Sequence, residues 1–266
     1  MAIALVSGQS ALAFAASPAT TVNVVLTNNP TAGNLVVVGF LDEGAAGTLS
    51  VADSNSNSYT AAGTLFTVTV PGNGRMNIFY LVNAPANASK TITCTTTSGA
   101  NLNAFAAEFS GAVTSSPLDG TPQTASAGAN NTAITTPSIT TTVNGDLIFG
   151  LAFAGGTITA VGGSFTFVGG GADSNGNAAE WMVQSTAGAQ AVNYTQSPSA
   201  LWSGMVAAFK AAATAQTPYQ PYFQQMLASR RKPIPGWREG YDHRWRRWRR
   251  ERGLIVPVKE IIRRAA

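Results

Sequence analysis

Apolar and polar residues alternate along most of the first 213 residues, with the period of two that is typical of half-buried β-strands. Clusters of Asn, Asp, Gly, Ser and Pro separate these stretches, and such residues supply the tight reversals and positive φ angles of turns. No segment before residue 214 has the 3.6-residue period of an amphipathic helix. The pattern predicts twelve or more short strands, of which the clearest cover 66–70, 76–82, 91–95, 147–153 and 192–194.

Short strands that are joined by turns, without crossover helices, indicate antiparallel sheets that pack face to face. The predicted fold class is therefore all-β, with a two-sheet, jelly-roll-like sandwich. A different kind of segment follows this sandwich, and we expect it to form an extended, partly helical, basic C-terminal arm over residues 214–266.

The chain repeats part of its own pattern, which indicates two similar halves. GNLVVVG at 33–39 is matched by GDLIFG at 145–150, the turn DSNSN at 53–57 by DSNGN at 173–177, and AAEF at 106–109 by VAAF at 206–209. Matched halves fit either one jelly roll or two small domains. Because neither half ends in an obvious linker, we favour a single domain over residues 1–213, with 115–137 as the connection between the halves.

Charge divides the chain into two parts. Only 11% of the 266 residues are charged, against about 25% in ordinary globular domains, so Thr, Ser, Asn and Gln must cover much of the surface. Residues 1–213 hold three basic and eight acidic side chains, a net charge of −5, whereas residues 214–266 hold thirteen basic and four acidic ones, a net charge of +9. This asymmetry is typical of an interaction segment attached to a neutral body.

The first residues, MAIALVSGQSALAFAASPA, allow two interpretations. Small residues near 13–16 resemble a signal-peptide cleavage region, but the segment has no Lys or Arg and SGQS interrupts its apolar run. We therefore favour a first β-strand. The sequence contains no run of about 18 apolar residues that would span a bilayer.

These segments together resemble the lectin- and glucanase-type jelly-roll modules of bacterial surface proteins and bacteriophage particles. The resemblance rests on AGNLVVVGF, DSNSNSYT, NIFYLVNAPANASKTITCT, AFAAEFSG, PLDG, NGDLIFGLAF and a final strand that ends in AAFK. It covers residues 1 to about 210 and leaves out the basic segment. It implies the jelly-roll fold, but the family includes sugar binders, adhesive modules and inert display modules, so it implies function less specifically.

Several kinds of chemistry have few candidate residues here. The lone Cys94 excludes an intramolecular disulfide, and with His243 as the only histidine a Cys/His zinc cluster is excluded too. His243 lies among arginines, far in sequence from any nucleophile of the body, which argues against a catalytic triad. A glycosidase needs two carboxylates beside one sugar, for which Glu108 and Glu180 are the candidates. Each stands alone in its strand, so we expect it to point outward or to pair with a cation, and we expect no enzyme activity.

The sequence also offers weak candidates for a calcium site and for a glycan site. The turns at Asp53 and Asp173 have oxygen-bearing side chains at alternate positions, as calcium loops do, but Thr64 and Gln184 stand where such a loop ends in an acid. We expect no metal or cofactor there and favour simple Asx turns. For a glycan, Trp181 and Tyr194 are the candidate stacking rings, and Tyr59 and Trp202 are also available. For all four rings the alternative is a place in the core.

The basic segment carries an amphipathic, cationic stretch. Asp242 is a credible N-cap and Gly253 a credible C-terminal stop of a short helix. The prolines at 218, 221, 233, 235 and 257 favour an extended strap over a surface, and hence a protein partner over nucleic acid or an anionic membrane. The candidate partner-docking residues are Tyr222, Phe223, Trp237, Tyr241, Arg244, Trp245, Arg247, Trp248 and Arg249.

These patterns predict a non-enzymatic structural or interaction protein. We expect a virion component of a bacteriophage, as capsid decoration or as an addition to the tail, that docks to other virion or scaffold proteins through residues 214–266. Its expected location is thus the virion or an extracellular surface. Low surface charge also favours homo-oligomers. The alternative is a carbohydrate-binding adhesin module that binds a surface glycan.

Overall fold

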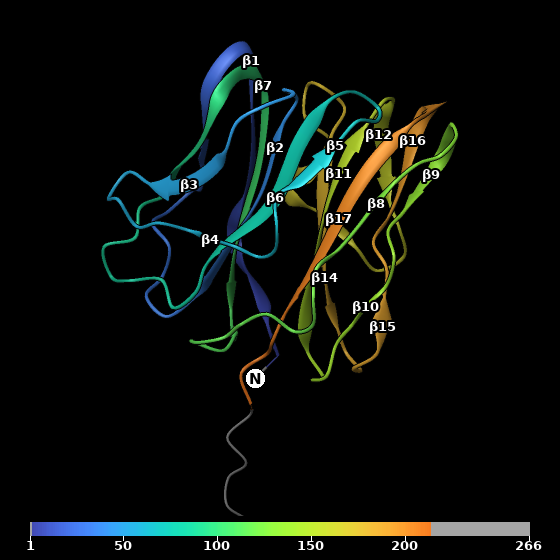
Figure 1. Cartoon of the computed structure of the whole chain (residues 1–266). Helices are drawn as coiled ribbons and strands as arrows, with labels where there is room; N and C mark the ends of the chain where they lie inside the picture. Colours follow the sequence, from blue (N-terminus) through green and yellow to red (C-terminus); the bar gives the residue numbers. More distant parts are fainter. Residues whose placement is uncertain (1, 214–266) are drawn as a thin grey trace, which may run out of the picture. The chain divides into compact units, whose positions relative to one another are not determined.

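The computed structural model describes residues 2–213, which belong to one compact unit, Met1–Ala215. These residues form antiparallel β-strands and one short 3-10 helix, and no α-helix occurs among them (Figure 1). The predicted all-β class is therefore confirmed. The first half contains β1 (Ala4–Val25), β2 (Leu35–Asp42), β3 (Leu49–Asp53), β4 (Thr60–Ala61), β5 (Phe66–Val68), β6 (Gly74–Leu81) and β7 (Thr91–Ser110).

The second half repeats this arrangement, with shorter strands in place of the long β1 and β7. It contains β8 (Gln123–Ser126), β9 (Asn131–Thr135), β10 (Ile139–Thr140), β11 (Asp146–Ala154), β12 (Thr157–Val161), β13 (Thr166–Phe167), η1 (Val168–Gly170), β14 (Ala178–Gln184), β15 (Ala189–Gln190), β16 (Asn193–Ala200) and β17 (Trp202–Phe209). The strand order β8-β17-β11-β14-β13 matches β1-β7-β2-β6-β4 of the first half. The strand order β9-β16-β12 likewise matches the second layer of the first half, β1-β7-β3.

In the first half, β1 and β7 are long enough to run through both layers. The first part of β1 pairs with the second part of β7 beside β2, whereas Thr21–Val25 pairs with Thr91–Thr95 beside β3. The register between β1 and β7 shifts near Ala19, next to Pro18, which is where the strands turn from one layer into the other. In the second half the same path is broken into two strands on each side, β8 with β9 and β16 with β17.

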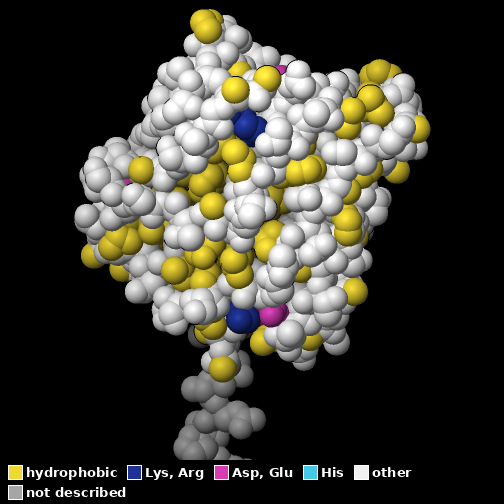
Figure 2. Space-filling model, in the orientation of Figure 1, with side chains coloured by type: hydrophobic (Ala, Val, Ile, Leu, Met, Phe, Trp, Pro, Cys, Tyr) yellow, Lys and Arg dark blue, Asp and Glu magenta, His cyan; other side chains and the backbone are white. Residues whose placement is uncertain are grey.

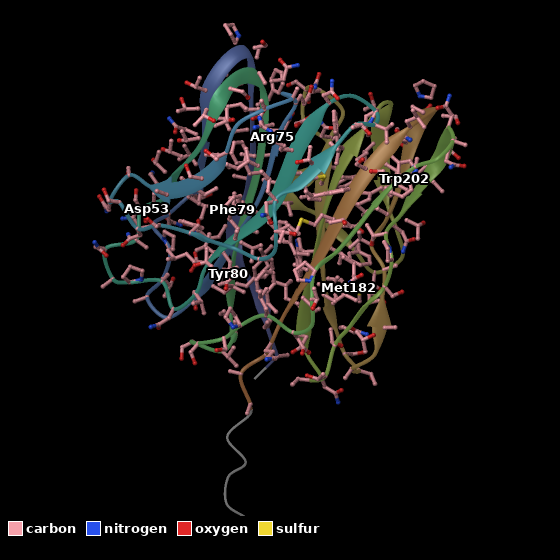
Figure 3. All side chains as sticks on the ribbon, viewed as in Figure 1. Asp53, Arg75, Phe79, Tyr80, Met182 and Trp202 are labelled. Carbon is pink, nitrogen blue, oxygen red and sulfur yellow. The ribbon has the colours of Figure 1, made fainter. Side chains whose placement is uncertain are left out.

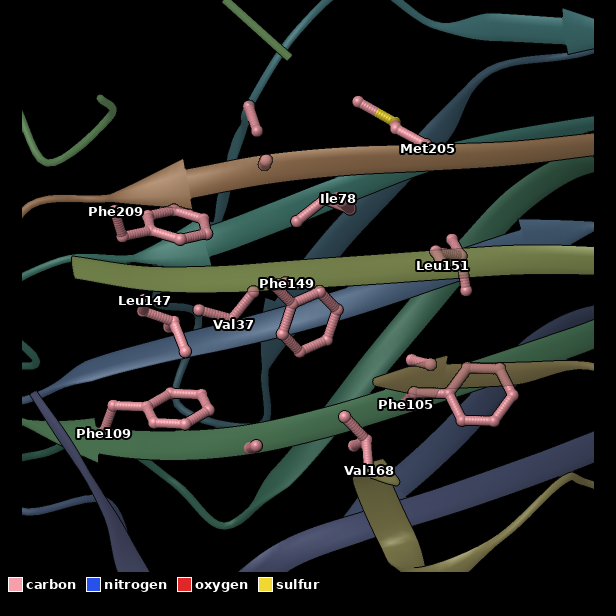
Figure 4. Close-up of a cluster of buried hydrophobic side chains, with 14 of the residues drawn as sticks. Val37, Ile78, Phe105, Phe109, Leu147, Phe149, Leu151, Val168, Met205 and Phe209 are labelled. Atoms are coloured by element: carbon pink, nitrogen blue, oxygen red, sulfur yellow. The ribbon is translucent and has the colours of Figure 1, made fainter. Parts of the chain in front are cut away.

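Three hydrophobic cores separate the layers. One lies between the two layers of the first half and contains Phe40 and Cys94, and one lies between the layers of the second half and contains Ile148 and Tyr194. The third lies between the halves, where β2, β6 and β7 face β11, β14 and β17 (Figure 4). The alternation predicted one pair of sheets, but the described residues form two sandwiches stacked face to face.

The central strands explain this arrangement. In β2, Val36, Val38 and Phe40 point into the first half, while Leu35, Val37 and Leu41 point toward the second. β11 alternates in the same way between its own half and the central core. Both faces of these strands are therefore buried, as in strands with near-continuous apolar sequences. Gly39 permits the close approach, since an added Cβ would lie 3.1 Å from Leu151 of the other half.

Candidate functional site

The charged side chains of the described residues are mostly buried. Asp42, Asp53, Arg75, Glu108, Asp119, Asp146, Asp173 and Glu180 are all at most 7% exposed. Glu43 and Lys210 are half-buried, which leaves Lys90 as the one exposed charged side chain of residues 2–213. On the face shown in Figure 2, uncharged atoms cover almost all of the surface. The body is thus even less charged on its surface than its composition indicates.

Asp42 and Arg75 form a buried ion pair inside the first half. The carboxylate of Asp42 accepts hydrogen bonds from Arg75, from the hydroxyls of Thr96 and Ser98, and from the backbone N–H of Gly44. Arg75 lies near the upper end of the first half in Figure 3. Its Nε and Nη1 are buried and have no hydrogen-bond partner among the described residues. The pair therefore joins the end of β2 and the beginning of β6 to the interior of β7, and it is not open to a ligand.

The turn at Asp53 is an Asx turn in which both carboxylate oxygens accept hydrogen bonds. Its Oδ1 accepts the backbone N–H groups of Asn55 and Asn57, and its Oδ2 accepts the amide of Asn57 and the backbone N–H of Ser89. Burial alone would raise the pKa of Asp53, but these hydrogen bonds outweigh it and hold the pKa below its ordinary value. No group of three or more His, Cys, Asp or Glu that could hold a metal ion occurs among the described residues.

The turn at Asp173 has the same backbone geometry. Asn175 and Asn177 donate their backbone N–H groups to Oδ1 at 2.9 and 3.0 Å, as in the first half. The amide of Asn177, however, donates to Glu43 of the other half, and Asp173 Oδ2 is buried without a partner among the described residues. Burial, with a smaller contribution from the charge of Glu43, raises the pKa of Asp173 to about 6, against the effect of the backbone N–H groups.

Glu108 and Glu180 lie in different halves and do not face one another. Glu108 is fully buried in the first half, where Gln9, Asn34 and the backbone N–H of Thr31 bind its carboxylate. Glu180 is fully buried in the second half, where burial raises its pKa to about 8. They are thus separate buried carboxyls and do not form the pair that a glycosidase places on either side of a sugar.

The rings considered for a glycan lie mainly in the cores. Tyr194, Tyr59 and Trp202 are 2%, 7% and 7% exposed, so their faces are not open to a sugar. Trp181 is half-buried, packs edge-on against Phe109 at a centroid distance of 5.3 Å, and has a buried Nε1. For these rings the structure favours the core alternative, because a sandwich with many Ala, Val and Thr residues needs large side chains to fill it.

A second acidic contact lies where the two ends of the described chain meet. The carboxyl groups of Asp119 and Asp146, which are 2% and 0% exposed, are in hydrogen-bonding contact. Asp146 accepts the backbone N–H of Ala211 at 2.7 Å, and Asp119 accepts the hydroxyl of Thr142 at 2.8 Å. Burial and the hydrogen bond to Asp119 raise the pKa of Asp146 to about 6, so the pair holds a shared proton below about pH 6 and loses it above.

Both ends of the described chain leave the body at this same pole. The backbone N–H of Ile3 donates to the carbonyl of Gly145, and an added Cβ on Gly145 would lie 3.2 Å from Ala2 and 3.6 Å from Ala211. Figure 1 shows the N-terminus beside the point where the described chain ends. Residues 214–266, with all nine candidate docking residues from Tyr222 to Arg249, lie outside the described residues, as does His243.

Sequence reasoning missed one group of residues at the seam between the halves. Glu43 accepts hydrogen bonds from the amides of Asn101, Asn103, Asn175 and Asn177, two from each half. The two asparagines of each pair are two residues apart, so their side chains lie on the same side of the chain. This spacing is the one sequence feature that could have indicated a shared partner.

Comparison with protein families, with curated proteins and with solved structures found no match to this chain. The resemblance to lectin- and glucanase-type jelly rolls therefore stays a prediction. No helix among residues 2–213 is long and apolar enough to cross a membrane.

Proposed function

We propose that this chain is a non-enzymatic structural protein of a bacteriophage particle, a capsid decoration or tail-associated component that docks through residues 214–266. One observation carries this proposal, the separation of charge within the chain. The body exposes one charged side chain, Lys90, among its described residues, whereas residues 214–266 have a net charge of +9 and seven aromatic residues. Such a division suits a neutral displayed body with a separate attachment segment.

The position of the chain ends supports the same proposal. The described chain ends close to Gly145, at one pole of the body, and the sequence continues from there into the docking segment. The covalent connection between the body and the proposed docking segment therefore lies at that pole. The neutral surface also supports contacts between copies, because it provides little charge repulsion against homo-oligomers.

We further propose that each half is a jelly roll. Support comes from the strand orders β1-β7-β2-β6 and β8-β17-β11-β14. In the first half β1 and β7 pass through both layers, and in the second half the same path is divided between β8 and β9 and between β16 and β17. The carbohydrate-binding alternative receives less support, because the ring of Tyr194 is buried and Trp181 packs against Phe109.

The test is whether the chain occurs on particles and is held there by its basic segment. Particles from the native source are separated on a density gradient, and this chain is identified in each fraction by mass spectrometry. We expect the full-length protein in the particle fractions and the variant with Trp245→Ala and Trp248→Ala in the free fractions. Lys90→Ala, which changes the exposed charge of the body, is the control and should stay with the particles. Unchanged incorporation of the double variant, or absence of the wild-type chain from all particles, would contradict the proposal.

A further inference from the structure

One of the amides that hold Glu43 at the seam between the halves belongs to an exposed residue, Asn175. Its Nδ2 donates a hydrogen bond to Glu43 Oε1 of the first half. Asp173 opens the turn that contains Asn175, and the charge of Glu43 contributes to the raised pKa of Asp173. Two acids thus already lie near each other at this place, and the amide of Asn175 is one of the donors that stabilise Glu43.

Asn175 is followed by Gly176, and an Asn-Gly pair has a chemistry of its own. The backbone nitrogen of the residue after an asparagine can attack the side-chain carbonyl carbon and close a five-membered ring. A Cβ on that residue hinders the attack, and glycine has none. Two further Asn-Gly pairs occur at 73–74 and 144–145, but among residues 2–213 no hydrogen bond joins either asparagine to a carboxylate.

The matching turn of the first half has the same backbone hydrogen bonds. Asn55 and Asn175 are both exposed, and each donates its backbone N–H at 2.9 Å to the aspartate that opens its turn. The next residue is Ser56 in the first half and Gly176 in the second. Its backbone N–H donates to the carbonyl of the same aspartate, at 2.9 Å from Ser56 and 3.1 Å from Gly176. At the attacking residue the two turns therefore differ by the side chain of Ser56.

We propose that Asn175 is a site of spontaneous deamidation, and that its conversion to a carboxylate weakens the seam between the halves. The nitrogen of Gly176 forms a bond to Cγ of Asn175, and Nδ2 leaves as ammonia with the proton of the Gly176 N–H. Water then opens the ring at either of its two carbonyls. One opening gives aspartate, and the other gives isoaspartate, in which the main chain runs through Cγ.

The product replaces a hydrogen-bond donor with an acceptor. An amide donates to Glu43, whereas an ionised carboxylate can only accept, so this hydrogen bond is lost. The new negative charge lies beside the carboxylate of Glu43, and like charges at such a place repel each other. Asn101, Asn103 and Asn177 still donate to Glu43, so we expect the seam to be weakened but not broken.

The first test follows the reaction in the full-length protein at mildly alkaline pH, in water enriched in heavy oxygen. Peptide mapping by mass spectrometry measures conversion at each asparagine, and the heavy oxygen separates this conversion from any that occurs during digestion. Asn175 should be converted at least roughly tenfold faster than Asn55, because a Cβ restricts the backbone that must bring the nitrogen to Cγ. A synthetic peptide of residues 171–179 serves as the positive control for the reaction.

Two variants make this comparison sharper. Ser56→Gly gives the first-half turn the sequence of the second-half turn, and it should bring conversion of Asn55 close to that of Asn175. Ser56 is exposed and has a φ of 64°, so glycine fits this position without strain. Asn175→Gln keeps an amide at the seam but cannot form the five-membered ring, so position 175 should stay unmodified.

The second test measures the effect on the seam with Asn175→Asp, which carries the charge of the product. Differential scanning calorimetry of the full-length protein near neutral pH should show a melting temperature lower by roughly 2–6 °C. Asn55→Asp is the matched control, because the amide of Asn55 donates to the carbonyl of Asn87 and not to an acid. Figure 3 shows Asp53 of this turn at the outer edge of the first half. The control should lower the melting temperature clearly less.

Three results would overturn the proposal. If the peptide is converted while Asn175 of the folded protein is not, the turn protects the amide. If Asn55 and Asn175 are converted at equal rates, the glycine does not direct the reaction. If Asn175→Asp is as stable as the wild type, deamidation does not weaken the seam.

Discussion

The two halves offer a natural experiment at one pair of equivalent positions, Asn34 and Asp146. In the first half, Asn34 donates its amide to the buried carboxylate of Glu108 at 2.6 Å. In the second half, Asp146 stands at the same place and contacts the buried carboxyl of Asp119. An amide can donate to a carboxylate at any pH, whereas two carboxyls can do so only while they hold a proton. We therefore predict that Asp146→Asn stabilises the protein at neutral pH.

The magnitude follows from the pKa of Asp146, which is about 6 in the folded protein against an ordinary 3.8. A raised folded pKa means that the stabilisation by the proton is complete below about pH 3.8 and lost as the pH rises through about 6. Two pKa units correspond to about 3 kcal/mol. Burial raises the pKa of Asp119, but its hydrogen bonds outweigh burial and lower the pKa below its ordinary value. The ionised form of Asp119 therefore stabilises the fold and offsets part of the stability that the ionised Asp146 costs. We expect a net gain of about 1–2 kcal/mol from Asp146→Asn above pH 7.

The assay is urea unfolding of the full-length protein between pH 4 and 8, followed by circular dichroism. In the variant, the amide oxygen introduced at position 146 would still accept the backbone N–H of Ala211, so the fold should be kept. At pH 7.5 the free energy of unfolding of the variant should exceed that of the wild type by about 1–2 kcal/mol, and the difference should shrink below pH 5. The reciprocal change, Asn34→Asp, should destabilise the protein at pH 7.5 by about 1–3 kcal/mol. Lower stability of Asp146→Asn at pH 7.5 would refute the reasoning.

Three further changes test other buried groups. Burial raises the pKa of Glu180 to about 8 from 4.5, so the stability of the wild type should fall as the pH rises from about 4.5 to 8. Glu180→Gln should flatten this part of the pH dependence measured by urea unfolding, and an unchanged slope would contradict the raised pKa. Asp42→Asn leaves the buried guanidinium of Arg75 without its counter-ion and should cost about 3–5 kcal/mol in the same assay, whereas a loss below about 1 kcal/mol would show that the charge is already compensated. Gly150→Ala places a Cβ 2.6 Å from Val192 and should lower stability by about 1–3 kcal/mol in thermal unfolding. Unchanged stability would show that the core between the layers of the second half shifts to accept a methyl group.

Much of the fold could be predicted from the sequence, because strands and turns depend on local pattern. The strand predicted at 76–82 corresponds to β6, which ends at Leu81, and the echo of DSNSN by DSNGN corresponds to two turns with the same hydrogen bonds from backbone N–H groups to the first aspartate. The number of layers could not be predicted from alternation. Along LVVVGFL in β2 both faces are apolar, so the sequence shows no alternation of apolar and polar residues that would tell one face from the other. A continuous apolar run indicates burial on both faces but not what covers each one.

The candidate site was harder to predict than the fold. The donor and acceptor residues of the seam are far apart in sequence, since Glu43 and Asn175 are separated by 132 positions. Composition showed that charges are few, but only the structure shows that most of those in residues 2–213 are inside. The expectation that acidic side chains point outward from their strands was wrong for Glu108 and Glu180.

The closeness of Ile3 and Ala211 to Gly145 has a consequence for engineering. A short linker could join these two ends, and new ends could be opened in an exposed loop such as 45–48 without cutting a strand. A circularly permuted chain of this kind should reach the same three-core fold. For the same reason the body could be inserted whole into a surface loop of another protein, because its two ends lie close enough together to join the two sides of that loop.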